Sequence, residues 1–219
     1  MKVINFAKSN TILNQFLTEL RDVNYQNNPL LFRNNVKRIG QIMAYEISKT
    51  LSYSVTTVTT PLADIDVQLP TDKIVLATVF RAGLPFHEGF LSYFDRAENA
   101  FVSAYRYYKD KEGTEVGIKI EYIATPDLNG KTLIIVDPML ATGGSMELAY
   151  EAFITKGKPA RVIFASVIGS QKGVDYMKKS FPSDDVQLYC GAIDPGLNEH
   201  KYIVPGLGDA GDLEYGEKL

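Results

Sequence analysis

The stretch Thr132–Ser145, TLIIVDPMLATGGS, decides the fold that we expect for this chain. Its apolar run, Leu133–Val136, is rich in β-branched residues and too short for a stable helix, so it predicts a buried strand of a parallel sheet. Asp137 follows directly, and then Pro138, which cannot continue a central strand. After the small residues of ATGGS, good helix formers fill Met146–Lys156. The order is therefore strand, acid, small-residue loop and helix.

This order of elements is typical of an anion-binding site. Loop glycines let backbone N–H groups close on a phosphate, and the free N–H groups at a helix start add attraction. The loop lacks the lysine of a nucleoside-triphosphate P-loop and the GxGxxG spacing of a dinucleotide site. An acid just before it suits a ribose 5-phosphate, whose two hydroxyls need a carboxylate acceptor. A turn of small residues between a strand and a helix more often has a purely structural role than a ligand-binding one. Because Asp137 precedes the ATGGS residues here, we favour ligand binding.

Three segments carry a resemblance to a known family. VDPMLATGGS resembles the phosphoribosyl-pyrophosphate (PRPP) loop of type I phosphoribosyltransferases, and proline after the acid is the form found in uracil phosphoribosyltransferases. FRAGL, Phe80–Leu84, resembles the pyrophosphate-side loop, and YIVPGLGDAGD, Tyr202–Asp212, resembles the uracil-binding segment. The resemblance implies an α/β fold: a type I phosphoribosyltransferase-like parallel sheet flanked by helices, with a β-hairpin arm and a C-terminal base-binding hood.

Composition narrows the class of protein. The chain has 219 residues, 45% of them hydrophobic and 22% charged, as is ordinary for one globular domain. A net charge of −3 makes nucleic acid an unlikely partner. One cysteine, Cys190, and two histidines exclude a disulfide framework and a thiolate or multi-histidine metal site. No signal peptide or membrane span is visible, so we expect a cytoplasmic protein without a membrane partner.

Hydrophobic periodicity predicts the other elements. Helices are expected from Asn10 or Thr11 to about Asp22 and from about Pro29 to Lys49, and an acidic, irregular linker after Leu62. A further helix begins near His87 and Glu88, to which we assign no chemistry. Another is expected over Gln171–Ser180. Apolar runs predict strands at Tyr53–Thr60, Ile74–Phe80, Phe101–Tyr107, Val116–Ile123, Ala160–Ile168 and Val186–Ile193.

We expect a single phosphoribosyltransferase domain over residues 1–219. Within it, residues 1–50 form an N-terminal helical segment, 104–124 the hairpin arm and 194–219 the base-binding hood. Strands that alternate with helices imply right-handed crossovers and a ligand at the carboxyl ends of the strands. Arg81 and Asp137 both fall at such ends, so we expect them to share one cleft.

The resemblance implies the site residues. Arg81, Arg106, Asp137 and Asp209 are the expected catalytic residues, although YRYY departs from the family's sequence around Arg106. Main-chain groups of Ile203, Gly208 and Ala210, together with Asp209, would bind uracil, since glycines let the backbone approach a flat base. PRPP would contact Arg81, Arg106, Asp137, Pro138, Met139, Leu140, Ala141, Thr142, Gly143, Gly144, Ser145 and Asp209.

The implied activity is a pyrimidine-salvage reaction in which uracil and PRPP give UMP and pyrophosphate. No covalent nucleophile is needed, in keeping with the absence of a convincing Ser/His/Asp or Cys/His set. Mg²⁺ is the expected cofactor, held by substrate oxygens and water without a dedicated protein cage, and with Asp209 as a candidate ligand. We expect a homodimer or higher homo-oligomer, and GTP is a candidate effector.

Three alternatives stay open at this point: transfer to another base such as a purine, a regulatory RNA-binding protein on the same fold, and a binding-only relative without turnover. The Asp-Pro dipeptide and the 202–212 segment argue against the first, and the acidic net charge against the second. Intact Asp137 and both arginines argue against the third. The family usually ends its motif GDAGDR, whereas Leu213 stands in the last position here.

Overall fold

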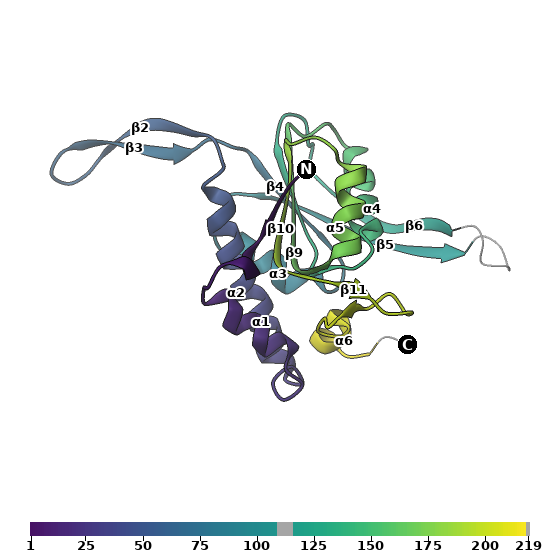
Figure 1. Cartoon of the computed structure of the whole chain (residues 1–219). Helices are drawn as coiled ribbons and strands as arrows, with labels where there is room; N and C mark the ends of the chain where they lie inside the picture. Colours follow the sequence, from purple (N-terminus) through teal and green to yellow (C-terminus); the bar gives the residue numbers. More distant parts are fainter. Residues whose placement is uncertain (109–115, 218–219) are drawn as a thin grey trace.

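The chain folds around one mostly parallel sheet (Figure 1). The computed structural model describes residues 1–108 and 116–217, and the side chains of 104–108 and 116–120 lie outside that description. The strand order is β1-β10-β9-β7-β4-β5-β6, with β8 pairing β9. The bounds are β1 Lys2–Asn5, β4 Ile74–Val79, β5 Glu98–Tyr108, β6 Val116–Ala124, β7 Thr132–Val136, β8 Met139–Leu140, β9 Arg161–Ser170 and β10 Val186–Asp194.

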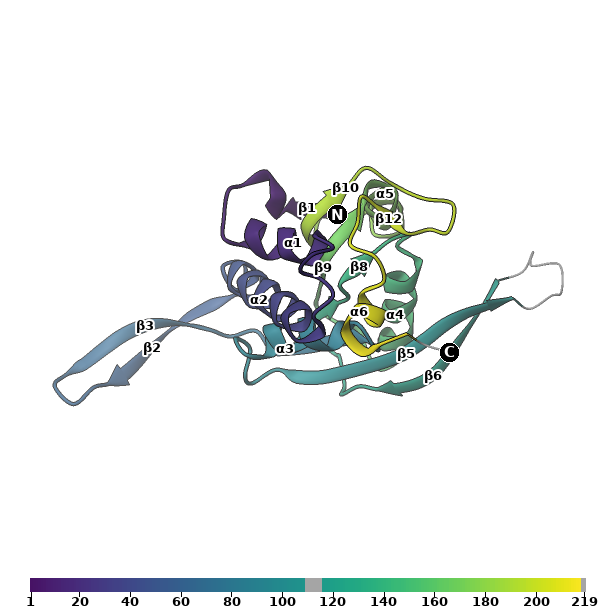
Figure 2. The ribbon, with the colours of Figure 1, turned by 90° about the horizontal axis from the view of Figure 1, so that it is seen from below.

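Helices cover both faces of this sheet, which makes a three-layer α/β fold (Figure 2). Alternation within β4 shows how the two faces differ: Leu76 packs with one group of helices, and Val75 and Ala77 pack with the other. The first group is α1 Leu13–Arg21, α2 Pro29–Ser48 and α3 Gly83–Leu91, and the second is α4 Gly144–Ile154 and α5 Gln171–Ser180. None of the helices in the described ranges is long and apolar enough to cross a membrane.

All the strand pairs of this sheet are parallel in the described ranges except β5 with β6. The carboxyl ends of β4, β7 and β10 therefore lie along the same side of the sheet, as expected for βαβ crossovers. Phe80 follows β4, Asp137 follows β7, and Asp194 ends β10. The fold class predicted from the sequence is thus confirmed, and the topology gathers the candidate residues on this side.

The N-terminal segment differs from the expectation in two ways. It begins with β1, which pairs β10 at the edge of the sheet, before the short 3-10 turn η1 Phe6–Lys8. A run of only four residues is too short to stand out by periodicity. The expected caps Asn10 and Thr11 are also wrong: α1 starts after Ile12, which makes no side-chain cap hydrogen bond. The second helix is confirmed, with Asn28 accepting hydrogen bonds from the first two free amides after Pro29.

The expected irregular linker after Leu62 is a strand. β2, Tyr53–Thr59, and β3, Asp64–Pro70, form an antiparallel hairpin that projects from the body of the molecule (Figure 1). The acids in DIDVQLP concealed the alternation of a strand, although Asp66 is paired: it accepts a hydrogen bond from Thr57 across the hairpin at 2.7 Å. The arm expected at 104–124 is the β5–β6 pair, and its tip falls outside the described residues.

Two helix positions also need correction. His87 and Glu88 lie in the middle of α3, because the helix already begins at Gly83, after the N-cap residue Ala82. His87 is buried, and its burial lowers the pKa of the imidazole.

The C-terminal segment contains a short pair, β11 Gly196–Leu197 with β12 Ile203–Val204, and the helix α6, Ala210–Tyr215.

Candidate active site

A cavity of about 630 Å³ opens at the carboxyl ends of β4 and β7. Segments from distant parts of the sequence form its wall, and they include the predicted Arg81, Asp137, Met139, Ala141, Ser145, Ile203, Gly208, Asp209 and Ala210. Its size is that of a small-molecule site. The structure therefore brings together residues from all three motifs that the sequence singled out.

Asp137 stands at the end of β7 with a half-buried side chain. Its Oδ1 accepts a hydrogen bond from the Met139 amide at 3.0 Å, which fixes the carboxylate at the mouth of the loop. Burial raises the pKa of Asp137 to about 6, and the Met139 amide offsets part of that rise. A carboxylate with few hydrogen-bond donors around it is ready to accept hydrogen bonds from the hydroxyl groups of a ligand.

The 137–145 loop joins β7 to α4. Pro138, Leu140, Gly143 and Gly144 are buried within its base, and Thr142 is half-buried. Gly143 has φ +87°, and a Cβ there would lie 2.7 Å from Tyr176 Cδ1. The turn therefore requires glycine both for its backbone conformation and for space.

Ser170 supports this loop from the next strand, and the sequence reasoning missed it. Its hydroxyl donates to the Ala141 carbonyl and accepts from the Gly173 amide, where it caps α5. Ser170 is fully buried. A serine directly before a helical run is a recognisable cap signal, but its second contact could not be predicted because it depends on the packing of β8 beside β9.

Arg81 lies directly after β4, joined to Phe80 by a cis peptide bond. Its Nη2 donates to Asp212 Oδ1 at 3.2 Å and to the Gly216 carbonyl at 3.4 Å, so the cavity wall is connected to the C-terminal segment. The guanidinium is 43% exposed and can exchange these partners for a ligand anion. Arg106 is placed in β5 opposite Ile118, and its side chain lies outside the described residues.

The 203–210 loop forms another part of the cavity wall. Ile203 and Ala210 are buried, Gly208 is exposed with φ +92°, and Asp209 lines the cavity between them. One Asp209 oxygen, Oδ1, accepts from the Asp212 amide at 3.1 Å and caps α6. A Cβ on Gly208 would meet nothing closer than Leu213 Cδ1 at 3.6 Å. Glycine is needed there for its backbone conformation, not for space.

Glu214 was not anticipated from the sequence. It is 1% exposed, and neither carboxyl oxygen has a hydrogen-bond partner among the described residues. Burial, with the nearby charge of Asp137 as a second cause, raises the pKa of Glu214 to about 9, while Arg33 and Arg81 oppose that rise. Glu214 therefore carries a proton at neutral pH. Arg33 also donates to the Glu214 main-chain carbonyl.

Several lining residues are not among the predicted site residues, although Phe80, Ala82, Tyr202 and Gly211 lie within the motif segments. They are Val79, Phe80, Ala82, Ser103, His200, Lys201, Tyr202 and Gly211. Lys201 has φ +65°, the only positive φ among the non-glycine residues that the structure describes. Such strained positions are frequent at ligand sites. The sequence contains only a weak signal that Lys201 lines a cavity, since a single Lys-Tyr pair beside the 203–210 loop is typical of an exposed surface loop.

The described ranges contain no group of three His, Cys, Asp or Glu side chains that could hold a metal ion. Asp137 and Asp209 are nonetheless hard oxygen donors on the cavity wall. A divalent cation such as Mg²⁺ binds through one or two carboxylates when phosphate oxygens and water complete its shell. The donor set therefore fits a metal that enters with a phosphorylated ligand.

Comparison with known proteins gives a consistent result. The family model described as uracil phosphoribosyltransferase matches residues 7–216. The chain is 58% identical to a uracil phosphoribosyltransferase of Porphyromonas gingivalis over 219 residues, 100% of both chains. It is 35% identical to one from Thermococcus kodakarensis, covering 99% of this chain and 92% of that one. A solved structure of a protein from Aquifex aeolicus covers 98% of both chains with a TM-score of 0.85 and 28% identity.

Proposed function

The chain belongs to the uracil phosphoribosyltransferase family, and from this premise we propose that the cavity beside Arg81 and Asp137 is its active site. The enzyme converts uracil and PRPP to UMP and pyrophosphate, a pentosyl transfer in pyrimidine salvage. The observation that carries the proposal is that one cavity is lined by all three motif segments. The purine, RNA-binding and binding-only alternatives give way to this activity.

On the PRPP side, the 137–145 loop holds the 5′-phosphate. Its support is the glycine-rich turn into α4, where backbone N–H groups are free of intrahelical partners. Asp137 accepts hydrogen bonds from the ribose hydroxyls at the end of β7, and Ser145 on the wall adds a hydroxyl. Pro138, Met139, Leu140, Ala141, Thr142, Gly143 and Gly144 complete this loop.

On the base side, main-chain groups of Ile203, Gly208 and Ala210 read the edge of uracil. Uracil presents two carbonyl acceptors and an N3–H donor, which exposed backbone can match. Cytosine would leave polar groups unpaired at two points, and such mismatches discriminate strongly. Support comes from the position of these residues on the wall of the same cavity as Asp137.

The two walls hold the reacting atoms in line. Uracil N1 forms a bond to the anomeric carbon and loses its proton to water, while the bond to the pyrophosphate oxygen breaks and pyrophosphate leaves with the electron pair. Arg81 stabilises the negative charge of this leaving group once it exchanges Asp212 for the ligand. Arg106, whose side chain lies outside the described residues, is proposed for the same role from the β5–β6 arm. Asp137 and Asp209 position the ribose.

The family generally uses Mg²⁺, which supplies positive charge to the diphosphate when bound. We propose Asp209, with pyrophosphate oxygens and water, as its contact on this chain, because Asp209 lines the cavity and no protein cage is present in the described residues. A cytoplasmic location is proposed on the grounds that PRPP and UMP are charged metabolites of the cell interior.

We also propose that the enzyme is a homo-oligomer. The β2–β3 hairpin stands away from the body (Figure 2), and a lone two-stranded hairpin is marginally stable in water. It exposes the apolar side chains Tyr53, Val55, Val58, Leu62, Ile65 and Leu69, with Leu62 96% exposed. Sedimentation measurements that compare the mass of the wild type with that of the Leu62→Asp variant test this proposal. Activation by GTP is a separate proposal, tested by adding GTP to the activity assay.

One experiment tests the activity and the site together. PRPP-dependent conversion of radiolabelled uracil is measured with cytosine, orotate and hypoxanthine as competing bases, in the presence and absence of Mg²⁺. Of the four bases, only uracil should be converted. The Arg81→Ala variant should have a lower kcat/KM for PRPP and a melting temperature close to that of the wild type. Equal conversion of another base, or an unchanged rate in Arg81→Ala, would overturn the assignment.

A further inference from the structure

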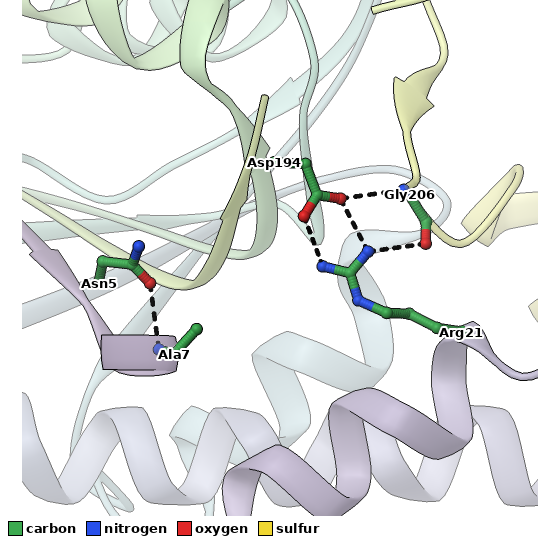
Figure 3. Close-up of polar contacts among 5 residues, drawn as sticks. All are labelled: Asn5, Ala7, Arg21, Asp194 and Gly206. Carbon is green, nitrogen blue, oxygen red and sulfur yellow. Dashed lines mark hydrogen bonds and ion pairs between the residues drawn. The ribbon is translucent and has the colours of Figure 1, made fainter. Parts of the chain in front are cut away.

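An ion pair outside the cavity lining holds the 203–210 loop by its backbone (Figure 3). Arg21, the last residue of α1, donates from Nη1 and Nη2 to the two carboxylate oxygens of Asp194 at 2.7 Å each. The same Nη1 donates to the Gly206 carbonyl at 2.9 Å, and the Gly206 amide donates to Asp194 Oδ2 at 2.9 Å. The main-chain N–H and C=O groups of Gly206 are thus both hydrogen-bonded to the Arg21–Asp194 ion pair.

This arrangement is built to be rigid. The Asp194 side chain is 8% exposed and that of Arg21 24%, so solvent screens their interaction little. A bidentate guanidinium–carboxylate pair has fixed geometry as well as strength. The anchors are fixed in turn: Leu13, Leu17 and Leu20 bury α1 against the core, and Asp194 ends β10, where it pairs with Ser170 of β9.

Gly206 is the position in the loop where a constraint has the most effect. Its φ is +63°, and a Cβ there would lie 2.0 Å from the Ile203 carbonyl oxygen. The loop therefore turns back on itself at Gly206, between the cavity residues Ile203 and Gly208. The Gln26 side chain, in the connection after α1, adds a weaker contact to the Leu207 carbonyl at 3.4 Å.

We infer that Arg21 and Asp194 are positioning residues for base recognition: by fixing the Gly206 peptide groups they set the backbone that reads uracil. The inference rests on the proposed uracil site. Neither residue lines the cavity. Their effect must therefore pass through the conformation of the 203–210 loop, and it should fall mainly on uracil, because Asp209 is the one residue of this loop proposed to contact PRPP.

The decisive variant is Arg21→Lys, which keeps the charge but cannot make the bidentate contact and the Gly206 contact together. Its matched control is Arg161→Lys. Arg161 also donates three side-chain hydrogen bonds, to the Thr50 carbonyl, the Thr50 hydroxyl and Gln187, and it begins β9 at the opposite edge of the sheet. Both variants lose comparable contacts, and only one touches the loop.

Two measurements decide the inference. In Arg21→Lys, KM for uracil should rise about tenfold while KM for PRPP stays within about twofold, a change of one decade being about 1.4 kcal/mol. Amide hydrogen exchange in residues 203–210 should also become at least about tenfold faster. Arg161→Lys should show neither change. An unchanged KM for uracil, an equal rise in both KM values, unchanged exchange, or the same result in Arg161→Lys would overturn the inference.

A second variant covers the case in which Arg21→Lys does not fold. Arg21→Met with Asp194→Leu removes both charges, and a buried pair replaced by apolar side chains generally folds. It should show the same rise in KM for uracil. The failure of the proposed base site is distinguishable: Gly208→Val would then leave uracil binding normal, whereas the exchange measurement still reports whether Arg21 holds the loop.

Discussion

The 137–145 loop and the 203–210 loop line one cavity but are held over different distances in the sequence. The first lies between β7 and α4, and its supports are nearer in the sequence: Asp137 accepts from Met139 two residues on, and the Ser170 hydroxyl donates to the carbonyl of Ala141, 29 residues before it. The second has little regular structure and depends on Arg21, whose partner Asp194 is 173 residues away. The conformation of the loop proposed for phosphate is therefore set by contacts that are near in the sequence, and that of the loop proposed for the base by contacts across the whole fold.

Their glycines differ in the same way. Gly143 needs glycine for both its φ of +87° and the crowding by Tyr176, whereas Gly208 has space and needs only its φ of +92°. A side chain at Gly143 would strain the packing of two helices. At Gly208 it would alter the backbone that faces the base and leave the core intact. Substitutions can thus separate PRPP binding from uracil binding.

The largest effect is expected at Asp137. Asp137→Asn removes the charged acceptor for the ribose hydroxyls, which should weaken kcat/KM for PRPP by about 1.5–3 kcal/mol, or roughly 10- to 150-fold. Stability should not fall at pH 8, because burial has raised the pKa of Asp137 to about 6 and the charged form is disfavoured in the fold. Steady-state kinetics and thermal melting measure both.

The same residue gives a pH dependence. Since the free enzyme needs the Asp137 carboxylate, kcat/KM for PRPP should decline below about pH 6 in the wild type. PRPP phosphates also titrate in this range, so Asp137→Asn is the control that retains only their contribution. Identical pH profiles for the two proteins would show that the ribose contact lies elsewhere.

The next effect concerns the 203–210 loop. Gly208→Val forces a β-branched residue into a left-handed conformation, which costs roughly 1–2 kcal/mol or more for an L-residue, so uracil affinity should fall at least about tenfold. PRPP affinity should be retained. Calorimetry measures each ligand, with uracil titrated in the presence of pyrophosphate. Gly196→Val is the control, because a Cβ there meets nothing within 4 Å and the chain is not left-handed.

Sequence reasoning predicted the first loop far better than the supports of the second. A β-branched run followed by an acid, proline and ATGGS specifies its own geometry, so Asp137 and Gly143 were found from adjacent residues. Arg21 and Asp194 could not be paired from the sequence, because nothing local distinguishes them from surface charges. The burial of Glu214 depends on how α6 packs against α2, which no local pattern reveals.

The errors in the fold have equally local causes. Asp64 and Asp66 gave β3 the composition of a linker, and its strand character depends on pairing with β2. β1 is four residues long and is stabilised as a strand only by β10. Both segments form strands because a neighbouring strand is available to pair with them. This tertiary contribution outweighs the β-propensity of their own residues.

A smaller effect is expected at Glu214, in α6. Its pKa is about 9 in the fold against an ordinary 4.5, so the native state binds more protons between these values. Stability from this group is complete below about pH 4.5 and is lost as the pH rises through about 9. Glu214→Gln should reduce the difference in melting temperature between pH 5 and pH 9 by at least about 2–4 °C. Exposed Glu217→Gln is the control, and an equal change there would assign the slope to general charge.

The smallest effect is expected at Ile203, and it separates recognition by main chain from recognition by side chain. Its side chain is 4% exposed and packs in the core, so Ile203→Val should cost about 0.5–1.5 kcal/mol of stability. The preference for uracil over cytosine should nonetheless stay within about twofold of the wild type, because the variant keeps every peptide group of the loop. Gly206→Ala is the opposite case: its Cβ would lie 2.0 Å from the Ile203 carbonyl oxygen, so that carbonyl must move and the preference should fall. Competition assays with both bases measure it. If Ile203→Val accepted cytosine while Gly206→Ala kept its discrimination, the base would be read by side chains, and the long-range support from Arg21 would have no role in specificity.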